Sequence, residues 1–181
     1  MDLRDITEFF KDFGKYIITM GVIVIVFVFI VALQPVAGNS MIPTLEEGAV
    51  VVVFKINPNL KRNQIVVVKG SDNKSYIKRI IGLPGEKIDY LNGILYINDR
   101  GYEETFLDDS IQTSNFLFDD ICSNKDCPNG VIPDGMYLLL GDNRSESVDS
   151  RTPDFGLRSK KDIKGKVILK IWPINKMGFV K

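Results

Sequence analysis

The sequence predicts a mostly β protein, in which a single N-terminal transmembrane helix precedes a coiled, partly closed antiparallel β-sheet with a small inserted subregion. Three observations lead to this fold class. One uninterrupted apolar run lies near the N-terminus, short β-branched segments bounded by turn residues fill the rest, and no amphipathic helix of ordinary length stands out after residue 40. Apolar residues make up 45% of the 181 residues, which suffices for one compact domain and an anchor.

The apolar run Tyr16–Leu33 contains no charged residue over its 18 positions. A helix needs roughly 17–25 apolar residues to cross a bilayer, so the run is long enough. We assign residues 1–15 to a cytoplasmic N-terminus, 16–36 to a transmembrane anchor and 37–181 to an extracytoplasmic β-rich domain. A cleaved signal peptide is the weaker alternative because its apolar region would be shorter. A buried soluble helix is weaker still, because this run is apolar on every side.

The orientation of the anchor follows from the basic residues near its ends. Arg4, Lys11 and Lys15 precede the span, whereas no Lys or Arg follows it until Lys55. Basic residues beside a span stay in the cytoplasm, and neighbouring acidic residues contribute little to this rule. The chain is therefore predicted to cross the cell membrane once, with its N-terminus in the cytoplasm.

After the anchor, short runs rich in Val, Ile, Leu and Tyr predict the strands of the sheet. Asn92-Gly93 lies between two of these runs and is a typical hairpin turn. The predicted strands are residues 50–54, 65–68, 75–81, 87–90, 94–97, 136–140 and 166–171.

Residues 101–130 differ from the rest because they carry a net charge of −6. We expect an inserted, solvated subregion here. It contains both cysteines, Cys122 and Cys127, which could form a local disulfide outside the cytoplasm or remain two free thiols. Residues 144–181 carry a net charge of +6, which suits anionic lipid head groups, although a basic solvated surface is the stronger interpretation.

The chain contains no histidine and has a net charge of zero. The missing histidine excludes a Ser-His-Asp triad, a Cys-His pair and every histidine-based metal site. Two cysteines cannot complete a structural zinc site, so we expect neither a metal nor a cofactor. The balanced charge gives no indication of nucleic-acid binding.

Three polar segments carry the candidate chemistry. Ser40 directly follows the anchor in the segment Ser-Met-Ile-Pro-Thr. Lys78 lies in an apolar strand, on the same face as Ile80, where burial would lower its pKa and leave a neutral amine able to deprotonate a serine. The third segment, residues 141–151, contains two arginines and two aspartates. These four side chains could form a fixed cluster of ion pairs.

Together the three segments resemble the type I signal peptidase family, of the Gram-positive branch. That family has Ser-Met-x-Pro-Thr, then Lys-Arg before Gly-x-Pro-Gly, then Gly-Asp-Asn-Arg ending in Ser-x-Asp-Ser-Arg. All three motifs occur here in order, behind an N-terminal span. The resemblance extends from the span to about Trp172 and is weakest over residues 101–130.

The resemblance implies a role for each matching residue. Ser40 is the nucleophile, Lys78 its general base, and Ser147 orients the lysine amine. Asp149 would pair with two arginines, Arg79 and Arg151. The Ser40 N–H would supply one oxyanion donor. Some relatives have a serine two positions before the nucleophile as a second donor, whereas here Gly38 could contribute only through its backbone or a water molecule.

The resemblance also implies that the chain removes signal peptides from exported preproteins, after small residues in an Ala-x-Ala pattern. The substrate would bind as an extended strand between the Ser40 and Lys78 segments. The expected partners are preprotein signal peptides, membrane lipid and the secretion translocon. The residues that match the walls of the family's shallow apolar pockets are Val36, Met41, Leu45, Tyr76 and Ile77.

Three other classes of protein are weaker hypotheses. A self-cleaving Ser-Lys repressor would need a DNA-binding region, and a membrane span stands in its place. A non-enzymatic helper of pilus assembly would have lost the nucleophile or the base, although an active enzyme could still have a narrow substrate set such as pilin subunits. A plain anchored binding domain would leave a lysine in an apolar strand unexplained.

Overall fold

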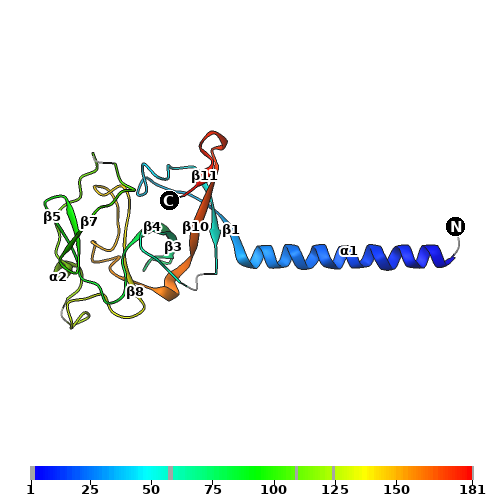
Figure 1. Cartoon of the computed structure of the whole chain (residues 1–181), viewed down its shortest axis with the longest axis horizontal. Helices are drawn as coiled ribbons and strands as arrows, with labels where there is room; N and C mark the ends of the chain where they lie inside the picture. The colour runs from blue at the N-terminus through cyan, green and yellow to red at the C-terminus, as the bar shows by residue number, and fades with distance from the viewer. Residues whose placement is uncertain (1–2, 57–58, 109, 124, 181) are drawn as a thin grey trace.

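In the computed structural model, one long helix projects from a β-rich body (Figure 1). The structure describes residues 3–56, 59–108, 110–123 and 125–180. The predicted fold class is confirmed, because the body is built on a curled, half-barrel antiparallel sheet.

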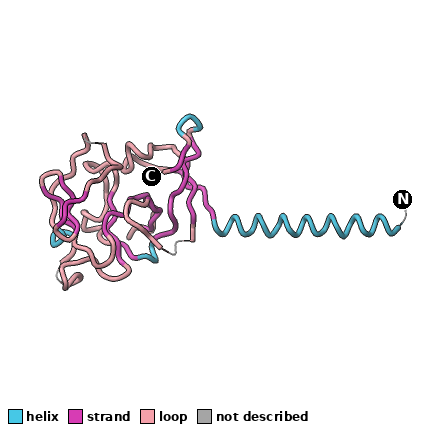
Figure 2. The backbone as a smooth tube through the Cα atoms, viewed as in Figure 1, coloured by secondary structure: helices cyan, strands magenta, loops and turns pink. Residues whose placement is uncertain are grey.

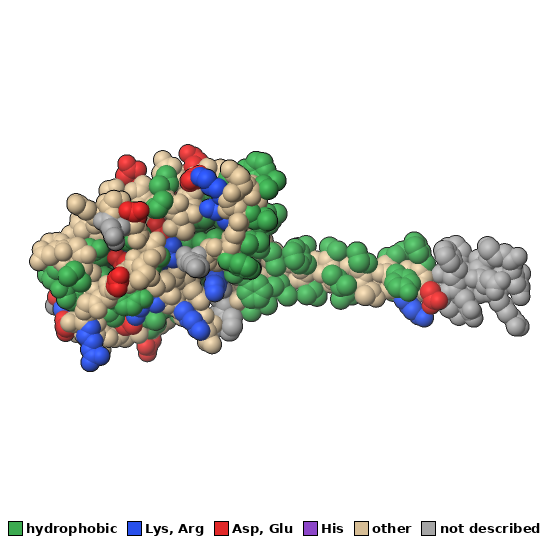
Figure 3. Space-filling view, turned by 45° about the horizontal axis from the view of Figure 1, so that its top comes forward, with side chains coloured by type: hydrophobic (Ala, Val, Ile, Leu, Met, Phe, Trp, Pro, Cys, Tyr) green, Lys and Arg blue, Asp and Glu red, His purple; other side chains and the backbone are tan. Residues whose placement is uncertain are grey.

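The helix α1 (Leu3–Ile30) is long and apolar enough to cross a membrane from Asp12 to Ile30. Figure 3 shows hydrophobic side chains along the coloured part of α1, and those from Phe13 to Phe29 are exposed. The predicted anchor ran to residue 36, whereas the helix ends at Ile30. The chain leaves the helix there because β1 (Val31–Pro35) pairs in antiparallel register with β2 (Val50–Phe54).

The main sheet runs in the order β1-β2-β10-β3-β4-β8-β9, and β11 pairs with β10. Every pair is antiparallel. Apart from β1 and β2, its strands are β3 (Ile65–Lys69), β4 (Ser75–Gly82), β8 (Met136–Leu140), β9 (Arg158–Ser159), β10 (Ile163–Trp172) and β11 (Gly178–Phe179). Two 3-10 turns, η1 (Lys160–Asp162) and η2 (Ile174–Lys176), flank β10.

The central strand β3 shows why this sheet is stable. Its side chains alternate between two hydrophobic cores, Ile65 and Val67 on one face and Val66 and Val68 on the other. All four side chains are buried. Burial on both faces explains why the run is continuously apolar rather than alternating.

A second, three-stranded sheet lies at the end of the body away from α1, as Figures 1 and 2 show. It consists of β5 (Ile88–Leu91), β6 (Ile94–Ile97) and β7 (Arg100–Tyr102). Asn92 and Gly93 both have positive φ, at 51° and 80°, which matches the tight hairpin turn predicted for them.

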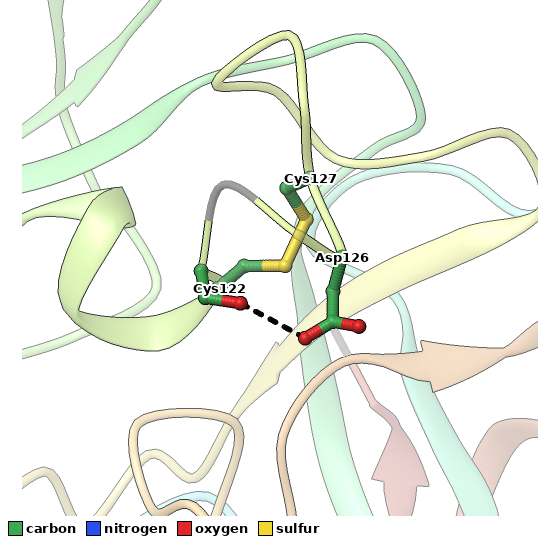
Figure 4. The surroundings of a disulfide bond; sticks show 4 residues. Cys122, Asp126 and Cys127 are labelled. Carbon is green, nitrogen blue, oxygen red and sulfur yellow. Dashed lines mark hydrogen bonds between the residues drawn. A yellow bond between two sulfur atoms is a disulfide. The ribbon is translucent and has the colours of Figure 1, made fainter.

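The acidic insertion is folded onto this second sheet and is less solvated than expected. Its one-turn helix α2 (Phe118–Ile121) buries Phe118, and Phe116 packs beside Tyr90. Cys122 and Cys127 form a disulfide, shown in Figure 4, that lies in the same hydrophobic core. Leu138 and Leu140 of β8 belong to this core as well, so the insertion is packed against a strand of the main sheet.

Candidate active site

Lys78 is the central residue of the site, and the strand β4 fixes its position. It lies opposite Val66 of β3, on the same sheet face as Tyr76 and Ile80. Only 1% of Lys78 is exposed. The predicted burial of this lysine is therefore present in the structure.

Burial lowers the pKa of Lys78 from its ordinary value of 10.5 to about 8. Three charged groups act on it more weakly than burial does. Asp149 and Asp142 raise the pKa of the amine, whereas Arg151 lowers it. The net effect favours a neutral amine, which can accept a proton.

The amine of Lys78 is held by a chain of polar contacts. Its Nζ donates a hydrogen bond to Ser147 Oγ at 3.1 Å, and Asp149 lies two positions further along the same loop. Asp149 in turn accepts two hydrogen bonds from the guanidinium of Arg151, both at 2.8 Å. Toward the lysine, the oxygen of Ser147 therefore acts as an acceptor.

Asp149 is buried and remains a carboxylate. Burial alone would raise its pKa, but the hydrogen bonds and charge of Arg151, together with the Gly141 N–H, lower it below the ordinary value. Because Arg151 already neutralises this carboxylate, Asp149 is a weak counter-ion for Lys78.

Ser40 is half-buried in the turn that follows β1. Its carbonyl accepts a hydrogen bond from the Asn143 N–H at 3.1 Å, and the Asn143 side chain donates to the Asn39 carbonyl. Two segments about 100 positions apart in the chain are joined by these contacts. The loop that carries Ser147 therefore also holds the backbone of Ser40.

Ser40 and Lys78 line one cavity of about 350 Å³. The other residues that line it are Ala37, Gly38, Asn39, Tyr76, Glu146 and Val148.

Only one of the five expected pocket-wall residues, Tyr76, lines this cavity. Val36, Met41 and Leu45 are buried in the core cluster that includes Ala49, and Ile77 packs against that cluster. Their side chains fill the interior because β1, β2 and β3 cover them. Ala37, Glu146 and Val148 line the cavity instead, and no role was expected for them.

The expected pairing of Asp149 with both arginines is correct only for Arg151. Among the described residues, the carboxylate that pairs with Arg79 is that of Asp142, with hydrogen bonds of 2.8 and 2.6 Å. Both side chains are fully buried, and Thr44 Oγ1 donates to Asp142 at 2.5 Å. Successive residues of a strand point to opposite faces, so Arg79 lies on the other face of β4 from Lys78 and meets a different aspartate.

Gly38 adopts a positive φ of 77°, and a Cβ built on it would meet no atom within 4 Å. A glycine is therefore favoured at position 38 by the backbone conformation and not by lack of space, because a serine would be strained at this φ. The Gly38 N–H points to Glu47 Oε1 at 3.4 Å.

Within the part of the chain that the structure describes, no group of three or more His, Cys, Asp or Glu side chains could hold a metal ion.

Comparisons with known proteins agree on one family. A sequence model of the family described as signal peptidase, peptidase S26, matches residues 7–172. Signal peptidase IB of Staphylococcus aureus strain MRSA252 is 36% identical, over 93% of this chain and 94% of the relative. Signal peptidase I of Bacillus caldolyticus is 35% identical, over 80% of this chain and 81% of the relative. The crystal structure of a signal peptidase I from Enterococcus faecalis V583 superimposes with a TM-score of 0.51 at 29% identity, over 60% of this chain and 96% of that one.

The buried pair Arg79–Asp142 gives a prediction about stability. We expect Asp142→Ala to lower the free energy of unfolding by about 3–5 kcal/mol, because it leaves the Arg79 charge buried without its carboxylate. Chemical denaturation of the full chain in detergent measures the change.

The matched control removes both charges at once. The double variant Arg79→Met, Asp142→Leu should be clearly more stable than Asp142→Ala, because no unpaired charge remains buried. Equal loss in the two variants would contradict this account of the pair.

Proposed function

The chain belongs to the signal peptidase family, peptidase S26, and we propose that it cleaves signal peptides from exported preproteins with Ser40 as nucleophile and Lys78 as general base. Members of this family are serine peptidases, which accords with the hydrolase expected from the sequence. The observation that carries the proposed dyad is the buried Lys78, in one cavity with Ser40.

The polar contacts of Lys78 support a direction for proton transfer. A neutral amine has two N–H groups and one lone pair. One N–H is directed to Ser147 Oγ, which leaves the lone pair free to accept the Ser40 proton. In the proposed reaction, Ser40 Oγ attacks the scissile carbonyl as its proton passes to Lys78. The resulting ammonium protonates the leaving amine, and Lys78 then activates water to hydrolyse the acyl-enzyme.

The tetrahedral intermediate needs hydrogen-bond donors for its oxyanion. We assign one to the Ser40 N–H, a contribution typically worth about 2.7–4 kcal/mol. The hydroxyl donor that some relatives have two positions earlier is missing, because Gly38 has no side chain. Gly38 would contribute only if its N–H turned from Glu47 toward the cavity or held a water molecule there.

One free strand edge supports binding of the substrate as an extended strand. β8 pairs with β4 only from Arg79 onward, so the part of β4 that contains Tyr76 and Lys78 has no strand partner on that side among the described residues. A peptide strand could add to this edge. The methyl group of Ala37 and the bare backbone of Gly38 line the same cavity as Lys78 and suit the small residues of an Ala-x-Ala cleavage site.

We further propose that α1 anchors the chain in the cell membrane with residues 1–15 in the cytoplasm and 37–181 outside. The side chains of Arg4 and Lys11, on which the orientation rests, lie outside the described part. The disulfide supports an oxidising location for the domain. The family function makes preproteins and the secretion translocon the proposed partners.

An exposed apolar surface supports contact of the domain with membrane lipid. Figure 3 shows hydrophobic side chains gathered on the edge of the body next to α1. The exposed hydrophobic residues between the end of β10 and β11 are Trp172, Ile174, Met177 and Phe179.

A narrow substrate set, such as pilin subunits, remains the second candidate. It uses the same dyad and differs only in which preproteins enter the cavity. A non-enzymatic role in pilus assembly is disfavoured, because Ser40, Lys78 and Ser147 are all present.

Substitution of the dyad tests the proposed chemistry. Ser40→Ala and Lys78→Ala should each lower the cleavage rate about 10⁴-fold or more, because each removes a group that acts on the reacting atoms. The assay follows cleavage of a preprotein with an Ala-x-Ala signal peptide by purified full-length enzyme in detergent.

Two control variants accompany the dyad. Lys74→Ala removes an exposed lysine of the turn before β4, and Cys122→Ser removes the disulfide. Both should keep processing activity. Full activity of Lys78→Ala would rule out the dyad.

The pKa of Lys78 predicts how activity depends on pH. A lysine with a pKa of about 8 is charged below that pH and neutral above it, so activity is present above about pH 8 and is lost as the pH falls through it. The neutral fraction rises about tenfold between about pH 7 and about pH 9. Initial rates measured at low substrate concentration should follow this rise, and a flat profile from about pH 6 to about pH 10 would contradict it.

Protease accessibility tests the proposed orientation. In cells whose wall has been removed, added protease should degrade the domain after residue 36, while an N-terminal tag stays protected until the membrane is permeabilised. Protection of the domain and cleavage of the tag would reverse the proposed topology.

A further inference from the structure

The acidic insertion contributes one residue, Glu104, to the surroundings of the catalytic loop. Its carboxylate accepts hydrogen bonds from Arg144 Nη1 at 2.9 Å and Nη2 at 2.6 Å. Thr113, also in the insertion, accepts from Arg144 Nη1 at 3.0 Å. The Arg144 side chain is fully buried and that of Glu104 is 7% exposed, so this pair is shielded from solvent.

Arg144 carries this contact to Gly141 at the start of the catalytic loop. Its Nε donates to the Gly141 carbonyl at 3.0 Å, while the Gly141 N–H donates to Asp149 at 3.0 Å. Both backbone groups of Gly141 are therefore held by charged side chains.

Gly141 packs directly against the two catalytic segments. A Cβ built on Gly141 would lie 2.2 Å from Ser147 Oγ and 2.4 Å from the Ser40 carbonyl oxygen, closer than any side chain tolerates. A small displacement of Gly141 would therefore move the serine that orients Lys78, the backbone of the nucleophile, or both.

We infer that Glu104 is a positioning residue for the dyad, acting through Arg144 and Gly141. This inference rests on the proposed function. Glu104 touches neither Ser40 nor Lys78 and takes no part in the chemistry. It fixes the guanidinium of Arg144, which fixes the Gly141 carbonyl, and this keeps the distance between Ser147 and the nucleophile segment constant. The insertion thus serves the reaction through the carboxylate of Glu104, with Thr113 as a second acceptor for Arg144.

A purely structural role for the same pair would have a different consequence. If Glu104 only held the insertion onto the body, its loss would lower the folded fraction and leave the turnover of each folded molecule unchanged. A positioning role lowers kcat of the folded enzyme and leaves KM nearly constant, because the binding edge of β4 lies elsewhere.

The experiment compares Glu104→Gln, which keeps the size of the side chain, with Glu104→Ala and Glu104→Asp. We expect kcat per folded molecule to fall about 10-fold in Glu104→Gln and about 100-fold in Glu104→Ala, because small misplacements of reacting groups have effects of this size. KM should stay within about twofold. Glu104→Asp, which restores the charge, should recover part of the loss.

The pH profile supplies a second readout. A looser loop lets water reach Lys78, so the acidic limb of kcat in Glu104→Gln should move to higher pH, toward the ordinary lysine value. Glu103→Gln is the matched control, since Glu103 is the exposed neighbour and the substitution changes the charge equally. It should leave both kcat and the profile unchanged.

Wild type and Lys78→Ala, assayed alongside, separate the two hypotheses. If wild type cleaves, Lys78→Ala does not, and Glu104→Ala turns over at the wild-type rate, the positioning role is overturned while the dyad stands. If wild type itself fails to cleave, hydrogen exchange of residues 141–147 still decides the matter. Faster exchange in Glu104→Gln than in Glu103→Gln supports the positioning role, and equal exchange overturns it.

Discussion

The burial of Lys78 without an available counter-ion is the constraint on which the rest of the site depends. A lysine held at a pKa of about 8 costs the folded state about 3 kcal/mol at neutral pH, relative to an exposed lysine. The pKa of Lys78 stays low because each nearby carboxylate is already paired with an arginine. Asp149 pairs with Arg151 and Asp142 with Arg79. If either carboxylate were unpaired, it would stabilise the ammonium and leave less of the neutral base.

The same two aspartates also connect the segments that meet at the site. Asp142 joins β4 to the turn of residues 40–44 through Arg79 and Thr44, and Asp149 joins Arg151 to the Gly141 backbone. Each carboxylate therefore has an electrostatic role and a geometric one. Buried ion pairs hold the loop between β8 and β9, whereas most connecting loops lie on the surface with fewer such contacts.

The sequence predicted the fold class, most strands and the buried lysine, because these depend on local patterns. The β-branched runs and the alternation of Lys78 with its apolar neighbours are visible in the chain itself.

The partner of Arg79 was assigned wrongly, since a choice between two aspartates seven positions apart depends on which strand face each loop reaches. The pocket walls were misjudged for a similar reason: whether Val36 or Ala37 faces the cavity depends on how the chain turns after β1. Glu104 gave no signal, because its contact with Arg144 spans 40 positions across an insertion that looked solvated.

The connection between α1 and the sheet bears on how a membrane-embedded substrate could reach the site. β1 begins at the residue after the helix ends, so no flexible linker separates them. Ser40 lies ten residues beyond Ile30, and an extended chain spans at most about 3.3–3.6 Å per residue, which puts the proposed nucleophile within about 36 Å of the helix end. With β1 fixed by its pairing to β2, this separation cannot vary much. A substrate whose own apolar segment lies in the same bilayer would then need only a short extended stretch to reach Ser40. A rigid β1 would thus make the position of the cut depend on distance from the membrane as well as on the size of the side chains that enter the cavity.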